Sequence, residues 1–183
     1  MASLRNSGKW GRQKLASVAP SAVFHEVQRF RQWFLYLPVA IVTVLVWWEF
    51  VQQVVLGRPT AERPIPDWLA WVFAVVFGLG LPAFLALVRL VTTVTPESLC
   101  VRLYPFRAVR ISIAEIENAA VREYSPIAEF GGWGVRQSRG RGRAYTAYGN
   151  KGVQLVVRGK GPILIGSQRA DELLATLRAL GVS

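Results

Sequence analysis

Two long apolar runs constrain the fold of this chain more than any other feature of its sequence. The first begins at Trp33 and becomes more polar toward its end, and the second continues for twenty-one residues without a charged side chain. A helix needs about 20 apolar residues to cross the hydrocarbon core of a bilayer, so each run is long enough to span a membrane. The runs therefore predict two transmembrane helices, at 34–56 and 68–88.

The distribution of charge predicts how these helices are oriented. Residues 1–33 carry six basic side chains against one acidic, residues 89–183 carry fourteen against seven, and the connecting segment 57–67 is neutral. Loops rich in Lys and Arg stay on the cytoplasmic side of a membrane. We therefore expect a multi-pass protein of the cytoplasmic (inner) membrane, with both termini cytoplasmic and 57–67 as a short outer loop that its three prolines stiffen.

Polar residues lie on one face of the first predicted helix. Glu49, Gln52 and Gln53 share this face by their i, i+3, i+4 spacing. Ionisable groups at membrane depth are candidates for function, so these three form a candidate intramembrane polar site. The alternative is an ordinary hydrated carboxylate at the far membrane interface.

Small residues recur every four positions along the second predicted helix. Ala74, Gly78 and Pro82 belong to this stripe. Small side chains let helix backbones approach closely, so the stripe predicts packing against the first helix. A docking face for a partner or a second copy of the chain is the alternative interpretation.

The segment before the first apolar run divides into two parts. Residues 1–20 are polar and basic, a composition typical of a disordered tail. Over 21–33, apolar side chains share one helical face, namely Val23, Val27, Phe30 and Phe34. This pattern predicts an amphipathic helix that either lies in the headgroup boundary or packs on the following domain.

Residues 89–183 follow a different pattern, in which apolar and polar residues alternate as in β-strands. Candidate strands are 99–104, 109–113, 119–124, 133–137, 143–147, 153–157 and 163–165, separated by turn-forming stretches. The chain then predicts a helix capped by Ser167, with Ala170, Leu173, Leu177 and Leu180 on its buried face and its end at Gly181. About seven short strands followed by one helix is the order of a pleckstrin-homology-like (PH-like) barrel.

Four segments of the chain carry a family resemblance, at 24–33, 124–134, 149–154 and 164–169. In these segments the chain resembles a family of uncharacterised bacterial membrane proteins that have two spans and a C-terminal domain like the bacterial PH domains. The resemblance extends from about residue 24 to the end and leaves the basic tail outside. It implies a fold class: a two-helix transmembrane hairpin followed by a PH-like antiparallel β-barrel or sandwich with a C-terminal helix.

An arginine- and glycine-rich stretch is the most conspicuous candidate for a binding site in residues 89–183. The predicted contact surface consists of Trp133, Arg136, Arg139, Arg141, Arg143 and Lys151. Basic side chains close to a membrane are attracted to anionic lipid headgroups by about 1 kcal/mol each. The alternatives are an acidic protein partner, a solvated turn and single-stranded nucleic acid, and nucleic acid is the partner we least expect.

Few residues in the sequence could carry catalysis or hold a cofactor. The chain has one cysteine, Cys100, and one histidine, His25, too few for an intrachain disulfide or a structural zinc site. We therefore expect a non-enzymatic membrane protein without a cofactor. Its basic domain would bind a protein partner, a second copy of the chain or the anionic membrane surface in a scaffold or accessory role. The alternative is a membrane enzyme or transporter accessory subunit that uses Glu49.

Overall fold

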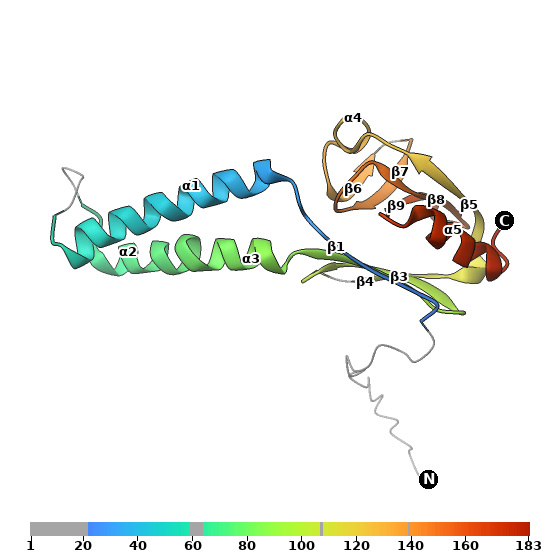
Figure 1. Cartoon of the computed structure of the whole chain (residues 1–183), viewed down its shortest axis with the longest axis horizontal. Helices are drawn as coiled ribbons and strands as arrows, with labels where there is room; N and C mark the ends of the chain where they lie inside the picture. The colour runs from blue at the N-terminus through green and yellow to red at the C-terminus, as the bar shows by residue number, and fades with distance from the viewer. Residues whose placement is uncertain (1–21, 59–63, 107, 139) are drawn as a thin grey trace, which may run out of the picture.

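The computed structural model describes residues 22–58, 64–106, 108–138 and 140–183, so the tail expected at 1–20 and part of the outer loop lie outside the described residues. A hairpin of two long helices projects from one end of a domain built of β-strands and short helices (Figure 1). The strands form two separate sheets, and a C-terminal helix lies beside them.

The helical hairpin begins and ends within one residue of the predicted spans. Its first arm consists of α1 (Trp33–Phe50) and the π-helical turn η1 (Val51–Val55). Its second arm consists of α2 (Asp67–Phe73), the π-helical segment η2 (Ala74–Gly80) and α3 (Leu81–Leu87). The buried residues of the two arms are Phe50, Ala70, Ala74 and Gly78. Both arms are long and apolar enough to cross a membrane, and most of their residues are exposed.

Small residues of the second arm face the first arm. Ala74 is buried with Phe50, and the indole Nε1 of Trp47 donates a hydrogen bond to the carbonyl of Gly78 at 3.3 Å. A Cβ atom at Gly78 would lie 2.8 Å from the same nitrogen, so only glycine fits there without a shift of the indole. Pro82, one turn further, is half-buried near the start of α3. The stripe therefore contacts the other arm of the same hairpin.

The first sheet runs in the order β1-β2-β3-β4, with every neighbouring pair antiparallel. Its strands are β1 (Phe24–Arg29), β2 (Arg89–Val94), β3 (Ser98–Tyr104) and β4 (Ala108–Ser112). The chain leaves β1, forms the whole hairpin and returns directly into β2, where Arg29 lies opposite Arg89. The hairpin is thus an insertion between two neighbouring strands of one sheet.

The amphipathic helix predicted at 21–33 is wrong, because this segment contains strand β1. Phe24, Glu26 and Gln28 alternate as buried residues, and two of these three are polar, so the apolar pattern of a half-buried strand is hidden. Val27, which the helix hypothesis placed on the apolar face, is exposed. The strand also depends on β2, a partner about 60 residues away that local periodicity does not reveal.

The second sheet runs in the order β5-β8-β9-β7-β6. Its strands are β5 (Ile116–Glu123), β6 (Gly134–Ser138), β7 (Gly142–Thr146), β8 (Lys151–Val157) and β9 (Gly161–Gly166). The expected fold class was an antiparallel barrel or sandwich. The two sheets do not close into a barrel, and the antiparallel expectation is wrong for one pair, because β7 pairs with β9 in parallel. The 3-10 turn η3 (Ile113–Glu115) connects the first sheet to the second.

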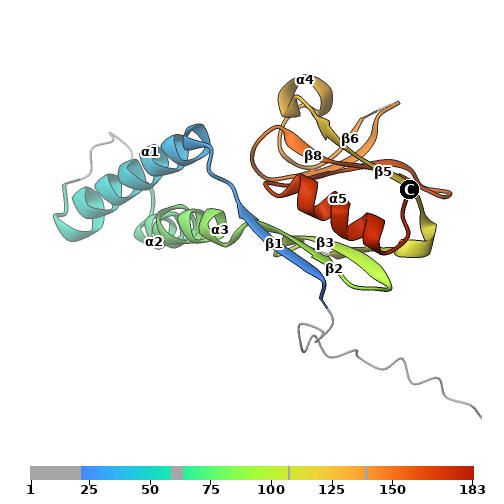
Figure 2. The same ribbon diagram turned by 45° about the vertical axis from the view of Figure 1, so that its right-hand side comes forward.

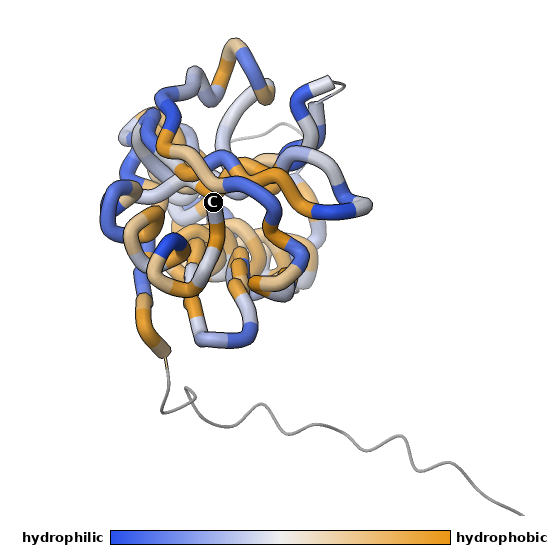
Figure 3. Tube along the Cα trace, turned by 90° about the vertical axis from the view of Figure 1, so that its right-hand side faces the viewer, coloured by the Kyte–Doolittle hydropathy of each residue, from blue (hydrophilic) through white to orange (hydrophobic). Residues whose placement is uncertain are grey.

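The C-terminal helix α5 (Ala170–Ala179) lies between the two sheets (Figures 1 and 2). Its buried residues Leu173 and Leu177 join one apolar core with side chains of both sheets, among them Leu90 and Leu155. Hydrophilic and hydrophobic residues are interspersed along the trace of this domain (Figure 3), as expected when one face of each strand is turned to the core. The helix agrees with the prediction, except that Arg169 rather than Ser167 is its N-cap.

A short helix, α4 (Pro126–Phe130), was not expected from the sequence. The Ser125 side chain accepts a hydrogen bond from the Ala128 N–H at its start, and Gly131 ends it with a positive φ of 71°. Phe130 packs with Tyr124 and Leu164 on the side of the second sheet that faces away from the main core. The second sheet therefore has apolar side chains packed on both of its faces.

Candidate anion-binding site

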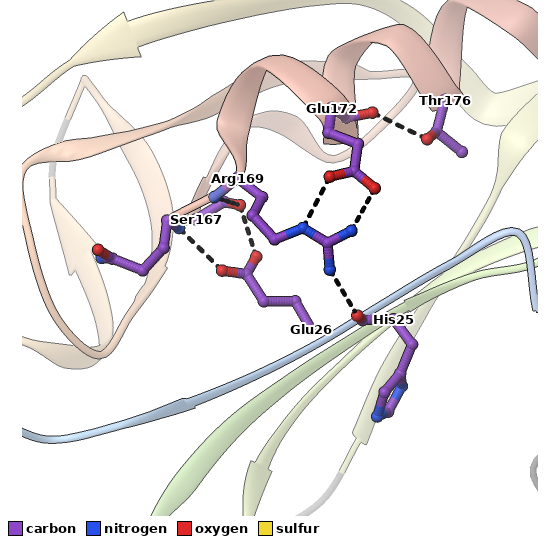
Figure 4. Close-up of polar contacts among 7 residues, drawn as sticks. His25, Glu26, Ser167, Arg169, Glu172 and Thr176 are labelled. Carbon is purple, nitrogen blue, oxygen red and sulfur yellow. Dashed lines mark hydrogen bonds and ion pairs between the residues drawn. The ribbon is translucent and has the colours of Figure 1, made fainter.

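Strand β1 is attached to the rest of the domain by buried polar side chains. The carboxylate of Glu26 accepts one hydrogen bond from the Ser167 hydroxyl and one of 2.9 Å from the Gln168 backbone N–H (Figure 4). Both Glu26 and Ser167 are buried. A buried carboxylate that accepts two hydrogen bonds fixes its strand firmly against the turn before α5.

Two glutamines extend this attachment toward the helical hairpin. The side-chain amide of Gln28 donates to the carbonyl of Gly166 at 2.8 Å, and that of Gln32 donates to the carbonyl of Ala147 at 2.7 Å. Both glutamines are buried. The segment that leads from β1 into α1 is therefore joined to β9 and to the β7–β8 turn. This attachment fixes the exposed arginines of the same segment in position.

Arg169 links β1 to the first turn of α5. Its Nε donates to the Glu172 carboxylate at 2.7 Å, and its Nη1 donates to the backbone carbonyl of His25 at 3.3 Å (Figure 4). The hydrogen bonds to Glu172 raise the pKa of the Arg169 guanidinium. Its cationic head also lies 5.0 Å from the centre of the Phe24 ring. Arg169 is thus an anchoring residue whose charge Glu172 already balances.

An open cleft of about 360 Å³ follows the free edge of β1. It is lined by side chains from β1, from the β7–β8 turn and from the start of α5, including Arg29, Arg31, Tyr148 and Gln168. The Arg31 guanidinium lies 5.9 Å from the centre of the Tyr148 ring. Among the described residues, neither Arg29 nor Arg31 forms an ion pair with an acidic side chain. These two cations give the cleft its positive charge.

The outer face of the first sheet is also cationic. Its four strands contain one acidic residue, Glu26, whose side chain is turned inward. Arg29 lies opposite Arg89, and Arg89 lies opposite Tyr104, in one row at the end of the sheet nearest the hairpin. The guanidinium groups of Arg89 and Arg102 lie 5.1 and 5.3 Å from the centre of the Tyr104 ring. Stacking of this kind holds an arginine in a defined orientation.

The structure does not gather the basic residues predicted from the sequence on a single face. Arg136 in β6 pairs with Ala144, whereas Arg143 in β7 pairs with Gln137, the next residue of β6. Because side chains alternate along a strand, Arg136 and Arg143 point to opposite faces of the sheet. Arg139 lies outside the described residues.

The remaining predicted residues have neighbours of their own. Arg141 is exposed. The pKa of Glu129 is lowered mainly by the hydrogen bond from the Ser125 N–H, and the charges of Arg122 and Arg141 lower it further. Lys151 is exposed at the start of β8, opposite Glu123 of β5. Arg141 and Lys151 each therefore have an acidic neighbour, Glu129 and Glu123 respectively.

Trp133 packs against the helical hairpin. Its ring centre lies 5.6 Å from that of Phe34, the second residue of α1, and its side chain contacts the main core. The carbonyl of Trp133 accepts a hydrogen bond of 3.2 Å from Arg136 Nε. On the other arm, Phe84 of α3 lies 6.3 Å from Phe106 in the β3–β4 turn. One aromatic pair thus joins each arm of the hairpin to the β domain.

The polar residues of the first arm lie near the far end of the hairpin. The Gln53 amide donates to the Ile65 carbonyl at 2.6 Å and to the Asp67 carboxylate at 3.0 Å, which ties the two arms together. Glu49 and Gln53 line a mostly apolar pocket of about 340 Å³ between the arms. Gln52 is half-buried on η1.

Within the described residues, no group of three or more His, Cys, Asp and Glu side chains is placed to hold a metal ion. His25 lies in β1 with its Nδ1 3.0 Å from the Thr93 hydroxyl, and Cys100 is a half-buried residue of β3 with a free thiol. Both have ordinary sheet environments. The candidate binding residues of the β domain are therefore its exposed arginines.

Sequence reasoning did not single out the cationic row at the base of the hairpin. Arg29 and Arg89 are 60 positions apart, and only the β1–β2 register brings them together. One signal was visible: Arg29 and Arg31 shortly precede the first apolar run, and Arg89 directly follows the second.

The fold and the site together define a class of protein: a domain of two β-sheets and a C-terminal helix, into whose first sheet a long apolar helical hairpin is inserted. The chain belongs to a family of unknown function, DUF6141, whose model matches residues 17–180. The match covers the hairpin, both sheets and all of α5. No curated protein and no solved structure matches the chain.

Proposed function

We propose that this chain is an integral protein of a bacterial inner membrane, a non-enzymatic scaffold whose β domain is held at the cytoplasmic surface and binds anionic lipid headgroups there. The observation that carries the proposal is the inserted hairpin. Its arms are exposed along almost their whole length, and a soluble protein rarely exposes a contiguous apolar surface of that size. A bilayer would cover this surface.

The insertion also supports the proposed orientation. Because the arms start from the neighbouring strands β1 and β2, the two parts of the β domain lie at the same end of the hairpin. If both arms cross, everything described outside them faces one side of the membrane. The excess of Lys and Arg before and after the hairpin favours the cytoplasmic side.

The charge of the domain supports the proposed ligand. Arg29, Arg89 and Arg102 gather at the end of the first sheet that would face the headgroups, and that sheet face carries no acidic side chain. The order of two sheets and a C-terminal helix is also compatible with a PH-like domain, which we retain as part of the proposal.

The full chain reconstituted in lipid nanodiscs tests this proposal. We expect amide hydrogen exchange at the ends of the strands nearest the hairpin to slow when an anionic lipid replaces about a third of a neutral one. High salt should reverse the effect, because ionic screening weakens contacts to a charged surface. Equal exchange in neutral and anionic nanodiscs would remove the lipid-binding part of the proposal. Extraction of the chain from native membranes by alkaline carbonate would remove the anchoring part.

The pocket between the arms supports a second candidate function, an accessory role within a membrane enzyme or transporter. Its walls are apolar except for Glu49 and Gln53, and ionisable groups at this depth are often functional. This role requires Glu49→Gln to change the activity of a partner complex while the chain still inserts and folds. An unchanged activity would count against it.

A further inference from the structure

The β1–β2 pair contains two like charges at directly opposite positions. Arg29 and Arg89 are partners in the register, and both are exposed, so they project from the same face of the sheet. Like charges opposite each other destabilise an antiparallel pair. No acidic side chain among the described residues forms an ion pair with either of them. An anion between the two guanidinium groups would turn this repulsion into attraction.

A third arginine adjoins the pair. Arg102 and Arg89 both stack on the ring of Tyr104, which occupies the next position in the same row. The Nε of Arg102 is buried and has no hydrogen-bond partner among the described residues. A buried N–H without a partner is costly, so a ligand oxygen that reached it would add to the binding energy.

The surface beside Arg29 is hollowed. An open depression of about 740 Å³ is lined by Val27, Arg29, Phe30, Arg31 and Tyr36, at the junction of β1 and α1. The Tyr36 hydroxyl is already occupied, because it donates to the Phe30 carbonyl. The side-chain donors left for a ligand in the depression are therefore the guanidinium groups of Arg29 and Arg31, and its other side chains are apolar or aromatic. This combination suits a phosphate attached to a glycerol and its acyl chains.

The depression lies where the first arm of the hairpin begins, and Arg89 adjoins it as the register partner of Arg29. Arg29 is the last residue of β1, shortly before α1, and Arg89 is the first residue of β2, directly after the hairpin. If the arms span a bilayer, a ligand held between these arginines would lie at the level of the headgroups of the same leaflet. A lipid could then bind without leaving the membrane.

We propose that Arg29 and Arg89, with Arg31 and Arg102 beside them, bind the phosphate of a lipid whose headgroup has a net negative charge. This inference rests on the membrane anchoring proposed above and adds a defined site for a single lipid. Guanidinium groups suit phosphate because their planar N–H edges bind its oxygens in pairs. The structure supplies two such groups side by side on one rigid sheet.

The test uses the full chain in detergent micelles and follows its thermal unfolding while short-chain phosphatidylglycerol is added. A lipid that binds only the folded state raises the unfolding midpoint as its concentration rises. The double variant R29Q/R89Q should weaken this binding by about tenfold or more, since each basic residue contributes about 1 kcal/mol near anionic lipid. Without the lipid, the same variant should be as stable as the wild type or more stable, because the like-charge repulsion has been removed.

The matched control is the variant R110Q. Arg110 belongs to the outer face of the same sheet, where it pairs with Cys100, four residue positions farther from the hairpin than the row of Arg89 and Tyr104. Its loss also lowers the net charge but should leave the lipid effect unchanged. Equal weakening by R110Q and by the single variants R29Q and R89Q would show a diffuse charge effect and overturn the site.

Two other ligands test whether binding needs a net negative charge and whether it needs acyl chains. Short-chain phosphatidylcholine, which has a phosphate but no net charge, should raise the midpoint much less than phosphatidylglycerol. Soluble glycerol phosphate should have little effect, because it lacks the acyl chains that concentrate a lipid in the micelle. Equal stabilisation by either compound would overturn the claim of an anionic lipid. A chain that carbonate extracts from membranes would instead refute the anchoring, so the two failures are distinguishable.

Discussion

At the scale of single residues, the polar side chains of β1 are the ones whose roles the structure defines most sharply. Glu26 faces the interior and binds the turn before α5 through two hydrogen bonds. Glu172, in contrast, pairs with Arg169 on the surface, where about half of each side chain is exposed. The two carboxylates lie on either side of Arg169 (Figure 4), yet they differ in burial and so in their expected contribution to stability.

The variant Glu26→Ala is expected to lower the free energy of unfolding by about 2–4 kcal/mol. It removes two hydrogen bonds and leaves the buried O–H of Ser167 without the carboxylate that accepts from it. Glu172→Ala is the matched control and should cost less than about 1 kcal/mol, because it removes an exposed ion pair. Chemical denaturation of the detergent-solubilised chain measures both. Equal costs would contradict the role assigned to Glu26.

Glu129 should make the β domain sensitive to acid. The Ser125 N–H and Arg122 lower its pKa below the ordinary value of 4.5, so the folded state favours the carboxylate. The stabilisation is present above that value and is lost as the pH falls through the lower pKa of the folded state. Glu129→Gln should therefore lower the unfolding midpoint near neutral pH, and the difference from wild type should shrink as the pH falls below the ordinary pKa of a carboxyl group. A pH-independent difference would contradict this explanation.

At the scale of secondary-structure elements, the insertion of the hairpin changes the limits of the β domain. The predicted domain at 89–183 lacks β1, although Glu26, Gln28 and Gln32 all bind elements within that range. Strand β2 would then become an edge strand, and the inner face of the sheet would lose Phe24. The domain therefore comprises β1 together with 89–183, and the hairpin is its insertion.

Removal of the hairpin should leave a soluble, folded protein. Residues 22–32 would be joined to 88–183 by a Gly/Ser linker of about six residues, which suffices because Arg29 and Arg89 are paired neighbours. We expect a cooperative unfolding transition and protected amides in β1. The fragment 89–183 alone should be markedly less stable or aggregate. Equal stability of the two proteins would show that β1 is dispensable.

The elements differed in how well the sequence predicted them, for physical reasons. The hairpin was predictable because a continuous apolar run signals a helix without any knowledge of tertiary contacts. Strands such as β3 and β8 showed alternating apolar residues, and α5 showed an apolar face at helical spacing. Strand β1 did not, since its inward side chains are mostly polar and are satisfied only by partners in the distant second sheet.

The candidate site was harder to predict than the fold for a related reason. A cluster such as Arg139–Arg143 is conspicuous because it is contiguous, yet strand alternation divides its neighbours between two faces. Arg29, Arg89 and Arg102 are scattered along the chain and come together only through the register of three strands. Predicting that row requires the strand pairing, which depends on the hairpin returning the chain to its starting point.

At the scale of the whole molecule, the proposed topology predicts that both ends of the chain face the same side of the membrane. In a C100S background, single cysteines introduced as Val23→Cys and Ser183→Cys should resist a membrane-impermeant maleimide in spheroplasts until the membrane is permeabilised. Arg58→Cys, at the far end of the hairpin, should react at once. The three positions are exposed in the structure. Labelling of residues 23 and 183 from opposite sides would exclude the insertion described above.

The pairing of β1 with β2 has a consequence for how such a chain is made. Strand β1 leaves the ribosome first but has no partner until both arms of the hairpin and then β2 have been synthesised. At about 5–20 residues per second, this wait lasts several seconds. If the arms insert into the bilayer during that time, successful insertion brings the two strands together. Failed insertion leaves β1 and β2 apart. The β domain would then fold only in chains whose hairpin has inserted into the membrane. A cell could therefore remove chains that failed to insert by degrading unfolded ones.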